Sequence, residues 1–340
     1  MTLATTVAVV MFLGVTLYAL FAGADFGGGV WDLLAGDARR GKDARDLIEH
    51  SVAPVWEANH VWLIFVLVVL WTGFPRAFAP IMSTLAVPLT LAAVGIILRG
   101  SAFAFRKASG PVETQRRFGA VFAASSVLTP FFLGSVVGGI ASGRVPARGT
   151  GSLMRSWVNP TSMLGGVLAV VVCAFLAAVY LTADADTREN AQLADYFRRR
   201  AIGAGVAAGV VAAVGVAVLH ADAARLFGHL TGRALPLLIL SGIGGLGALV
   251  LLRARHYRAA RVPAALAVVA VIWGWAAGQY PFLIVGRLTI ADARGAQATL
   301  EALLACSILG LLVVGPALAW LLVLTRRGTL RGADDARQPT

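Results

Sequence analysis

Long apolar stretches alternate with short charged segments along the whole chain. Nine stretches without a charged residue cover positions 1–24, 58–75, 77–98, 118–143, 156–183, 201–221, 234–252, 262–286 and 302–325. Each approaches or exceeds the roughly 18 to 20 residues that an α-helix needs to cross the hydrocarbon of a bilayer. The pattern predicts an all-α integral membrane protein with about nine transmembrane helices. We expect one polytopic domain over 1–325 and a short cytoplasmic tail over 326–340.

The first stretch has no basic residues before it and runs on into "GADFGGGVWD" without a small-residue cleavage site. This arrangement is typical of a retained span and not of a cleaved signal peptide.

Lys and Arg residues are distributed unequally between the loops. The loops after odd-numbered stretches, together with the C-terminal tail, hold 21 of the 29 Lys and Arg residues. Positive charge accumulates on the cytoplasmic side of membrane proteins. The charges therefore predict an N-terminus outside and a C-terminus in the cytoplasm, which an odd number of spans requires.

The composition agrees with a membrane protein, because 58% of the 340 residues are hydrophobic and only 14% are charged. The formal charge of +12 is better explained by orientation in a bilayer than by nucleic-acid binding. Cys173 and Cys306 both lie within apolar stretches. We therefore predict neither a disulfide framework nor a cysteine metal site.

Three ionisable residues fall at membrane depth, where a charge costs on the order of 2.5 to 3.5 kcal/mol. Asp25 ends the first apolar stretch, Glu57 lies early in the second helix, and Arg99 ends the third stretch. The predicted topology brings all three to the cytoplasmic side. Two hypotheses stay open: carboxylates near a cation that hold or relay a proton, and a structural ion pair that docks the first three helices. Glu301 opens the ninth span near the outside. We expect its carboxylate to stabilise the N-terminus of that helix through the helix dipole.

The glycines of "DFGGGVWD" indicate close backbone approach or a helix irregularity. A phosphate-binding loop is disfavoured, since no strand precedes the glycines and the GxxxxGK[ST] spacing is missing. Pro54 is expected to begin the second helix.

His60 is the one histidine near a span interior with polar neighbours, because the others fall in predicted loops or at a helix end. A b-type haem takes His or Met as an axial ligand. For a lone histidine beside Asn59 and Trp62, a hydrogen-bonding role next to Glu57 is the favoured interpretation.

Several segments resemble a known family. They are "GADFGGGVWDLL", "RDLIEHSVAPVWEANHVWLIF", "FPRAF", "ILRGSAFAFR", "WVNPTSMLGG", "QYPFLI" and "LTIADARGAQATLEAL". They resemble subunit II of the bd-type quinol oxidases, over nearly the whole chain and most specifically in its first third.

The resemblance implies two four-helix groups plus a peripheral helix, in a multi-pass protein of the bacterial cell membrane. It implies a heterodimer with a subunit I that carries all haems, of b and d type, and the quinol site. This chain would then ligate no haem or metal and hold no catalytic residue. The complex would oxidise quinol and reduce O₂ to water, with chemical protons from the cytoplasm, generating a proton-motive force without pumping. A small accessory subunit, membrane lipid and a structural lipid or quinone are compatible with it.

By position in the motifs, Asp25, Glu57 and Arg99 match acidic and basic positions of the family, and Trp62 matches a tryptophan of the second helix. In the family, the position of Glu57 belongs to a hydrophilic route that leads protons towards the partner's haems. The predicted proton path is thus Asp25, Glu57, His60 and Arg99. Some members have Asp in place of Glu57 and Gln in place of His60; either change keeps a proton-bearing or hydrogen-bonding group.

One segment departs from the family. Asp292, Arg294 and Gly295 stand where its members commonly have a loop rich in Asn, Ala and Ser. Charges in this loop are expected to affect assembly without touching the proton route.

Two alternatives remain. An ion-coupled secondary transporter usually binds near the midplane with matching interruptions in two halves; here the charges cluster in the first three helices, and the later spans hold no matching set. A purely structural subunit without a proton role is also compatible with the resemblance.

Overall fold

The computed structural model describes residues 2–36, 41–108 and 112–326. For 52–58, 106–108, 112–113, 115–116, 318–319 and 321–326 it describes the backbone alone. The predicted tail beyond 326 lies outside the described residues.

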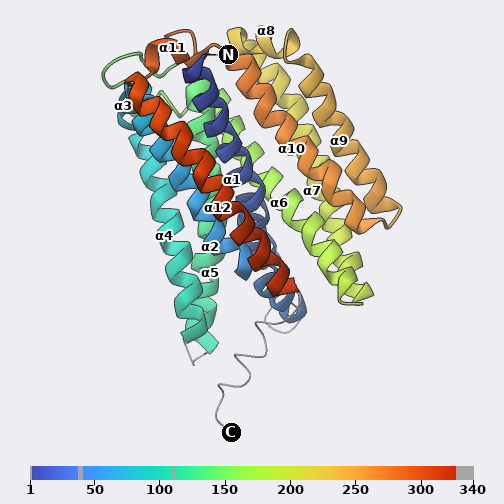
Figure 1. The fold of residues 1–340 in the computed structure, drawn as a ribbon. Helices are drawn as coiled ribbons and strands as arrows, with labels where there is room; N and C mark the ends of the chain where they lie inside the picture. Colours follow the sequence, from blue (N-terminus) through green and yellow to red (C-terminus); the bar gives the residue numbers. More distant parts are fainter. Residues whose placement is uncertain (1, 37–40, 109–111, 327–340) are drawn as a thin grey trace.

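Within the described residues the chain is a helical bundle in two groups of four long helices (Figure 1). The first group is α1 (Leu3–Leu33), α2 (Lys42–Gly73), α4 (Ala86–Ala108) and α5 (Val112–Ala141). The second is α6 (Pro160–Thr187), α7 (Ala191–Asp222), α9 (Leu235–Arg253) and α10 (Tyr257–Gln279). The peripheral α12 (Gln297–Arg326) packs against α1 and α2. Short elements complete the fold: α3 (Pro75–Thr84), α8 (Ala224–Thr231), α11 (Ile290–Ala293) and an antiparallel pair of strands, β1 (Phe282–Ile284) and β2 (Leu288–Thr289).

The number of spans agrees with the nine predicted helices. In the described part, eight helices are long and apolar enough to cross a membrane, and the bent pair of α2 and α3 brings the count to nine. The start of α1 and the end of α12 lie at opposite ends of the bundle (Figure 1). The side that faces the cytoplasm stays a prediction from the charged loops.

The third predicted span, 77–98, is wrong in its first half. After Phe74 the chain turns by 120° into α3, and the membrane-length helix α4 begins only at Ala86. Two prolines explain the breaks. Pro75 lacks an N–H group and disfavours helical backbone at Phe74. Pro88 cannot donate to the carbonyl four residues before it, that of Thr84, which is the last residue of α3.

Two further boundaries differ from the sequence-based prediction. The span predicted over 262–286 ends at Gln279, because Pro281 favours extended backbone at Tyr280, and the chain continues into the β1–β2 hairpin. The second helix does not begin at Pro54, since α2 starts at Lys42. Proline is tolerated inside a long membrane helix, where neighbouring helices satisfy the freed backbone groups.

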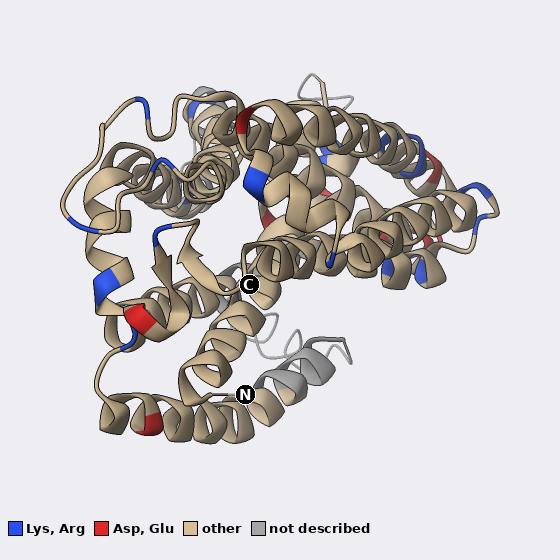
Figure 2. Ribbon diagram, turned by 90° about the horizontal axis from the view of Figure 1, so that it is seen from above, with Lys and Arg blue, Asp and Glu red and all other residues tan. Residues whose placement is uncertain are grey.

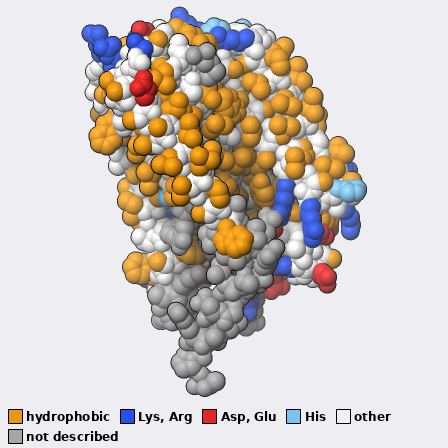
Figure 3. Space-filling model, viewed as in Figure 1, with side chains coloured by type: hydrophobic (Ala, Val, Ile, Leu, Met, Phe, Trp, Pro, Cys, Tyr) orange, Lys and Arg blue, Asp and Glu red, His pale blue; other side chains and the backbone are white. Residues whose placement is uncertain are grey.

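The surface matches a protein surrounded by lipid. Figure 3 shows hydrophobic side chains across the middle of one face, with Lys and Arg gathered near its upper and lower parts. Seen from above, charged positions are few along the ribbon (Figure 2). On α12, Leu309, Leu311, Leu312 and Val313 are 63, 63, 67 and 62% exposed. Such a large continuous apolar surface on a water-soluble monomer would be unusual.

The glycine cluster of α1 is explained by close helix packing. Gly27 lies directly against the backbone carbonyl of Cys173 on α6, and Gly29 lies against the hydroxyl of Ser126 on α5. Small residues let helices approach closely in lipid, where no hydrophobic force drives helix association. Of the two interpretations of "GGG", the structure shows close approach, because α1 is helical throughout.

We predict that Gly27→Ala destabilises the protein by about 1–3 kcal/mol, because the added methyl group collides with the main chain of α6. The measurement is the midpoint of thermal unfolding in detergent. Gly203→Ala on α7 is the matched control, since nothing lies within 4 Å of its added carbon. There we expect an unchanged or raised midpoint. Equal behaviour of the two variants would contradict the packing argument.

Candidate functional site

A buried ion pair joins α1 to α4 inside the first helix group. Nη1 of Arg99 donates to Oδ2 of Asp25 at 2.7 Å, and Nη2 donates to Oδ1 at 2.7 Å. Nη2 also donates to the backbone carbonyl of Asp25 at 3.0 Å. The side chains are 1% and 0% exposed. This two-pronged geometry is the strong form of the arginine–carboxylate interaction.

The rest of the guanidinium is held by α5 and by two aromatic rings. Nε of Arg99 donates to Oγ of Ser126 at 2.8 Å, and that hydroxyl donates to the carbonyl of Phe122 at 2.6 Å. The guanidinium carbon lies 5.0 Å from the ring centroid of Phe26 and 4.6 Å from that of Phe122. Cations are attracted to such ring faces, more strongly when desolvated. Arg99 is therefore fixed from α1 and α5 together.

The pair lies deeper than the sequence suggested. Asp25 was expected at the end of the first helix and Arg99 at the end of the third. Instead α1 continues to Leu33 and α4 to Ala108. At 1.5 Å of rise per residue, each charge lies roughly 12 to 14 Å from the end of its helix. Both charges are thus enclosed by the bundle.

The second helix adds an amide to this site. Nδ2 of Asn59 lies 3.5 Å from Oδ2 of Asp25, a long hydrogen bond, and the Asn59 side chain is fully buried. Oδ1 of Asn59 is buried without a hydrogen-bond partner among the described residues. Four helices, α1, α2, α4 and α5, therefore contribute polar groups to one buried cluster.

The structure gives fewer contacts for the other predicted site residues of α2, which are Trp62, His60 and Glu57. Trp62 lies about one helical turn after Asn59, stacks edge-on against Phe65 at 6.3 Å, and has a buried Nε1 without a described partner. His60 is half-buried at the position after Asn59. Glu57 lies within α2, but its side chain falls outside the described residues.

Two hydroxyl residues of the site were missed by sequence reasoning. Ser126 binds Arg99, and the fully buried Thr129 lies one turn further along α5 with its Oγ1 lacking a described partner. Both stand in the apolar segment "AASSVLTPFF". Ser and Thr hydroxyls in helices usually bond a carbonyl of their own helix, so their sequence gives no sign of a role.

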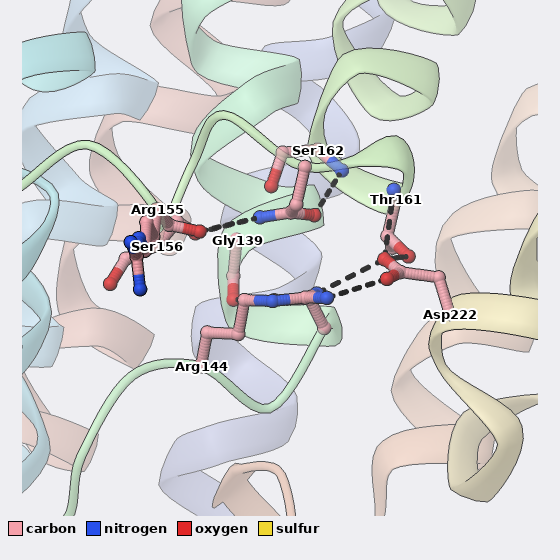
Figure 4. A network of polar contacts seen from close by, with 9 residues as sticks. Gly139, Arg144, Arg155, Ser156, Thr161, Ser162 and Asp222 are labelled. Carbon is pink, nitrogen blue, oxygen red and sulfur yellow. Dashed lines mark hydrogen bonds and ion pairs between the residues drawn. The ribbon is translucent and has the colours of Figure 1, made fainter. Parts of the chain in front are cut away.

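A second polar cluster lies at the opposite end of the helices. Nη2 and Nη1 of Arg144 donate to the two oxygens of Asp222 at 2.5 and 3.0 Å (Figure 4). The same carboxylate accepts from Oγ1 of Thr161 at 2.6 Å and from its backbone N–H at 3.2 Å. Asp222 thereby caps the N-terminus of α6, where negative charge is favourable. The cluster ties α6 to the ends of α5 and α7.

The charged loop before α12 is ordered by local bonds. Oγ1 of Thr289 and the carboxylate of Asp292 form a hydrogen bond of 2.5 Å, and the N–H of Gly295 donates to the carbonyl of Gly73 at 2.8 Å. Glu301 is exposed and accepts from Gln297 at 2.9 Å. None of these groups has a described contact with the Asp25–Arg99 pair. They lie with α3 and α11 at the other end of the bundle (Figure 1).

Among the described residues, no group of three or more His, Cys, Asp or Glu side chains is arranged to hold a metal ion. Nδ1 of His50 lies 2.6 Å from the carbonyl of Asp46, and Nδ1 of His229 lies 2.8 Å from that of Gly278. His220 packs against the ring of Phe227. His50 thus contacts a carbonyl of its own helix, His229 contacts a carbonyl of α10, and His220 packs against a ring.

The helices are long enough to cross a membrane, and they enclose a carboxylate–guanidinium pair. The chain is therefore a polytopic membrane protein that buries paired charges inside its helix bundle. Ionisable residues in such positions mark ion or proton routes, or helix docking.

The chain belongs to the cytochrome bd terminal oxidase subunit II family, whose model matches residues 3–325. It is 26% identical over 167 residues to the cytochrome bd ubiquinol oxidase subunit 2 of Bacillus subtilis (strain 168), covering 48% of this chain and 47% of the relative. It is 26% identical over 181 residues to the cytochrome bd-I ubiquinol oxidase subunit 2 of Escherichia coli (strain K12), covering 50% and 46%. The matches span about half the length of these curated relatives.

The fold is that of a solved oxidase. The bd oxidase from Geobacillus thermodenitrificans superposes with a TM-score of 0.76 at 24% identity, over 95% of this chain and 98% of that chain. The resemblance drawn from the sequence motifs is therefore confirmed, as is the multi-pass membrane fold. Family membership argues against the transporter hypothesis.

We predict strong coupling between the two buried charges. Asp25→Asn or Arg99→Gln alone leaves an uncompensated buried partner, which costs about 3–5 kcal/mol. The double variant Asp25→Asn/Arg99→Gln removes both charges, and its destabilisation should be well below the sum of the single effects. Thermal unfolding of the purified protein gives the three values. Asp195→Asn, at an ion pair near the start of α7, is the control with a small expected effect. Additive single effects would contradict the coupling.

Proposed function

We propose that this chain is subunit II of a bd-type terminal oxidase that oxidises quinol and reduces O₂ to water. The family match over residues 3–325 carries this proposal. On it, the chain scaffolds a haem-bearing subunit I and supplies part of a proton path from the cytoplasm. The complex generates a proton-motive force without pumping, because chemical protons and quinol protons are exchanged on opposite sides.

We place the haems, of b and d type, and the quinol site in subunit I. The places of three histidines support this division, because His220 and His229 lie in the last turns of α7 and α8, and His256 directly precedes α10. The haems supply the electron transfer and O₂ chemistry when the complex is assembled. This chain then contributes a scaffold for the helices of subunit I, and it supplies part of the proton path.

The proton path is supported by the polar groups around the buried pair. Oδ1 of Asn59, Nε1 of Trp62 and Oγ1 of Thr129 are buried and have no described partner. Buried polar atoms without partners cost roughly 1–3 kcal/mol each, so they mark places where a hydrogen-bonded chain fits. These atoms lie on α2 and α5, the two helices that contact the ion pair from either side.

Within this path the residues have different tasks. Both oxygens of Asp25 accept from Arg99, and three nitrogens of Arg99 are bound. The pair is therefore a fixed electrostatic anchor beside the path, and Glu57, two residues before Asn59 on α2, is the group that carries the proton. His60 and Trp62 shape the hydrogen bonds around it.

Glu57→Gln tests the proton role, because the amide keeps the shape of the side chain but cannot release a proton in the working pH range. We expect quinol-dependent O₂ consumption to fall by at least about tenfold, because positioned proton-transfer groups typically contribute about 10²–10⁴-fold. The b and d haem spectra of the assembled complex should be unchanged. Glu301→Gln, at an exposed glutamate of α12, should keep normal turnover.

Glu57→Asp separates proton transfer from assembly. It retains an ionisable carboxyl group, and we expect it to restore most of the turnover. Normal turnover of Glu57→Gln with intact haem spectra would refute the proton role. Haem loss in Glu57→Gln that Glu57→Asp also shows would assign the side chain to assembly instead.

His60 gives a separate prediction. His60→Gln should keep all haem spectra, because the side chain is proposed to hydrogen-bond and not to ligate iron. His60→Leu should keep the spectra but slow turnover. Loss of one haem signal in both variants, with subunit I still present, would identify His60 as an axial ligand and contradict the proposal.

A further inference from the structure

A pocket of about 360 Å³ lies where the two helix groups meet, near α8. Three segments line it: the end of α5 with Ser142 and Gly143, the α7–α8 junction from Asp222 to Leu226, and the hairpin turn from Val285 to Arg287. Its volume is in the range of small-ligand sites. The pocket is separate from the buried Asp25–Arg99 pair and lies beside the Arg144–Asp222 cluster of Figure 4.

The pocket has excess positive charge. Arg225 and Arg287 both line it. The one carboxylate in the lining, Asp222, is already neutralised by Arg144, which binds both of its oxygens. Nε of Arg287 donates to the carbonyl of Gly143 at 3.2 Å, and none of its described hydrogen bonds involves an acid. Two guanidinium groups therefore remain without a described counter-charge.

Arg225, an exposed residue, packs against the backbone of the hairpin turn. Its guanidinium lies directly against Gly286, so that a side-chain carbon at this position would collide with Nη1. Gly286 has a φ of +67°, a conformation that favours glycine. Among the described residues, Arg225 has no carboxylate partner. The pocket thus contains Arg287 from the hairpin turn and Arg225 from α8, which packs against that turn.

Helix α8 adds to the positive potential. The pocket is lined by Ala224, Arg225 and Leu226, which form the first turn of α8, and Ala223 before them provides no side-chain cap. First-turn N–H groups attract anions. Below the charged rim, Ala141, Ala223 and Leu226 belong to one buried apolar cluster, against which Leu230 and Trp275 pack.

The geometry points to a binding site for an anionic phosphate group, held by Arg225 and Arg287. Arginine forms two-pronged, charge-assisted hydrogen bonds with phosphate. Because the pocket lies at the ends of membrane-length helices, the phosphate of a phospholipid headgroup is the source favoured over free phosphate. A bound phosphate would bridge α8, through Arg225, and the β1–β2 hairpin turn, through Arg287. This inference does not depend on the proton path or on the reaction of the complex.

Retained lipid provides the first test. The purified complex is washed extensively with detergent, and lipid phosphorus is counted per protein for wild type, the Arg225→Gln/Arg287→Gln variant and Arg148→Gln. Arg148 is an exposed arginine outside the pocket, in the loop between α5 and α6. We expect the double variant to lose about one phospholipid and the control to lose none.

Titration of the delipidated complex provides the second test and separates the two sources. The thermal midpoint is followed as a short-chain anionic phospholipid or inorganic phosphate is added, since a ligand that binds the folded state raises it. For the phospholipid, the double variant should need at least about tenfold more ligand than wild type or Arg148→Gln. Arg225→Lys/Arg287→Gln, which keeps one charge, should fall between them.

Each outcome decides the proposal. A response to phospholipid alone assigns the site to a headgroup, and an equal response to inorganic phosphate assigns it to the free ion. Identical lipid retention and identical titrations in all variants would overturn the site. Unchanged lipid with loss of the partner subunit in the double variant would also overturn it, in favour of an acidic group on that partner.

Discussion

The Asp25–Arg99 ion pair is the constraint on which the first helix group depends. At 0% and 1% exposure, neither charge can exchange its partner for water, so α1 and α4 must meet at this depth. The pair also fixes how α1 is rotated. With Asp25 turned towards α4, Gly27 and Gly29 are left to face α6 and α5. One buried interaction and one glycine cluster therefore set the position of the same helix, and they are separated by only two residues in the sequence.

Hydropathy and charge predicted much of this arrangement, because both act along the chain. Nine spans and the convergence of Asp25 with Arg99 on one side follow from span length and loop charges alone. The break between α3 and α4 needed a finer argument. Residues 77–98 contain no charged residue, and the missing hydrogen bond from Pro88 to Thr84 marks where the helix stops. Because hydropathy carries no information on backbone hydrogen bonds, it predicted one span where the structure has two helices, α3 and α4.

Other features depend on contacts between distant segments and could not be predicted. Arg144 and Asp222 are 78 positions apart, and in the sequence each is a charged residue next to a predicted span, with no sign of a partner. They pair because α5 and α7 both end beside the first turn of α6, where Asp222 also binds Thr161. The role of Ser126 was hidden for a related reason, since a serine inside a helix is usually satisfied by its own backbone. Its contact with Arg99 exists only once α4 and α5 are packed.

The saturation of Arg99 bears on how protons could pass this region. Its guanidinium donates to both carboxylate oxygens and the carbonyl of Asp25 and to Ser126, and it lies between two aromatic rings. A group bound on all sides cannot swing to pass a proton without breaking a desolvated ion pair, which costs several kcal/mol. Transfer through Arg99 is thus disfavoured in any mechanism. Buried atoms without a described partner lie instead on α2, at Asn59 and Trp62, and on α5, at Thr129. On the proposed proton path, a mobile proton would follow these atoms, with the fixed pair setting the electrostatic potential along the route.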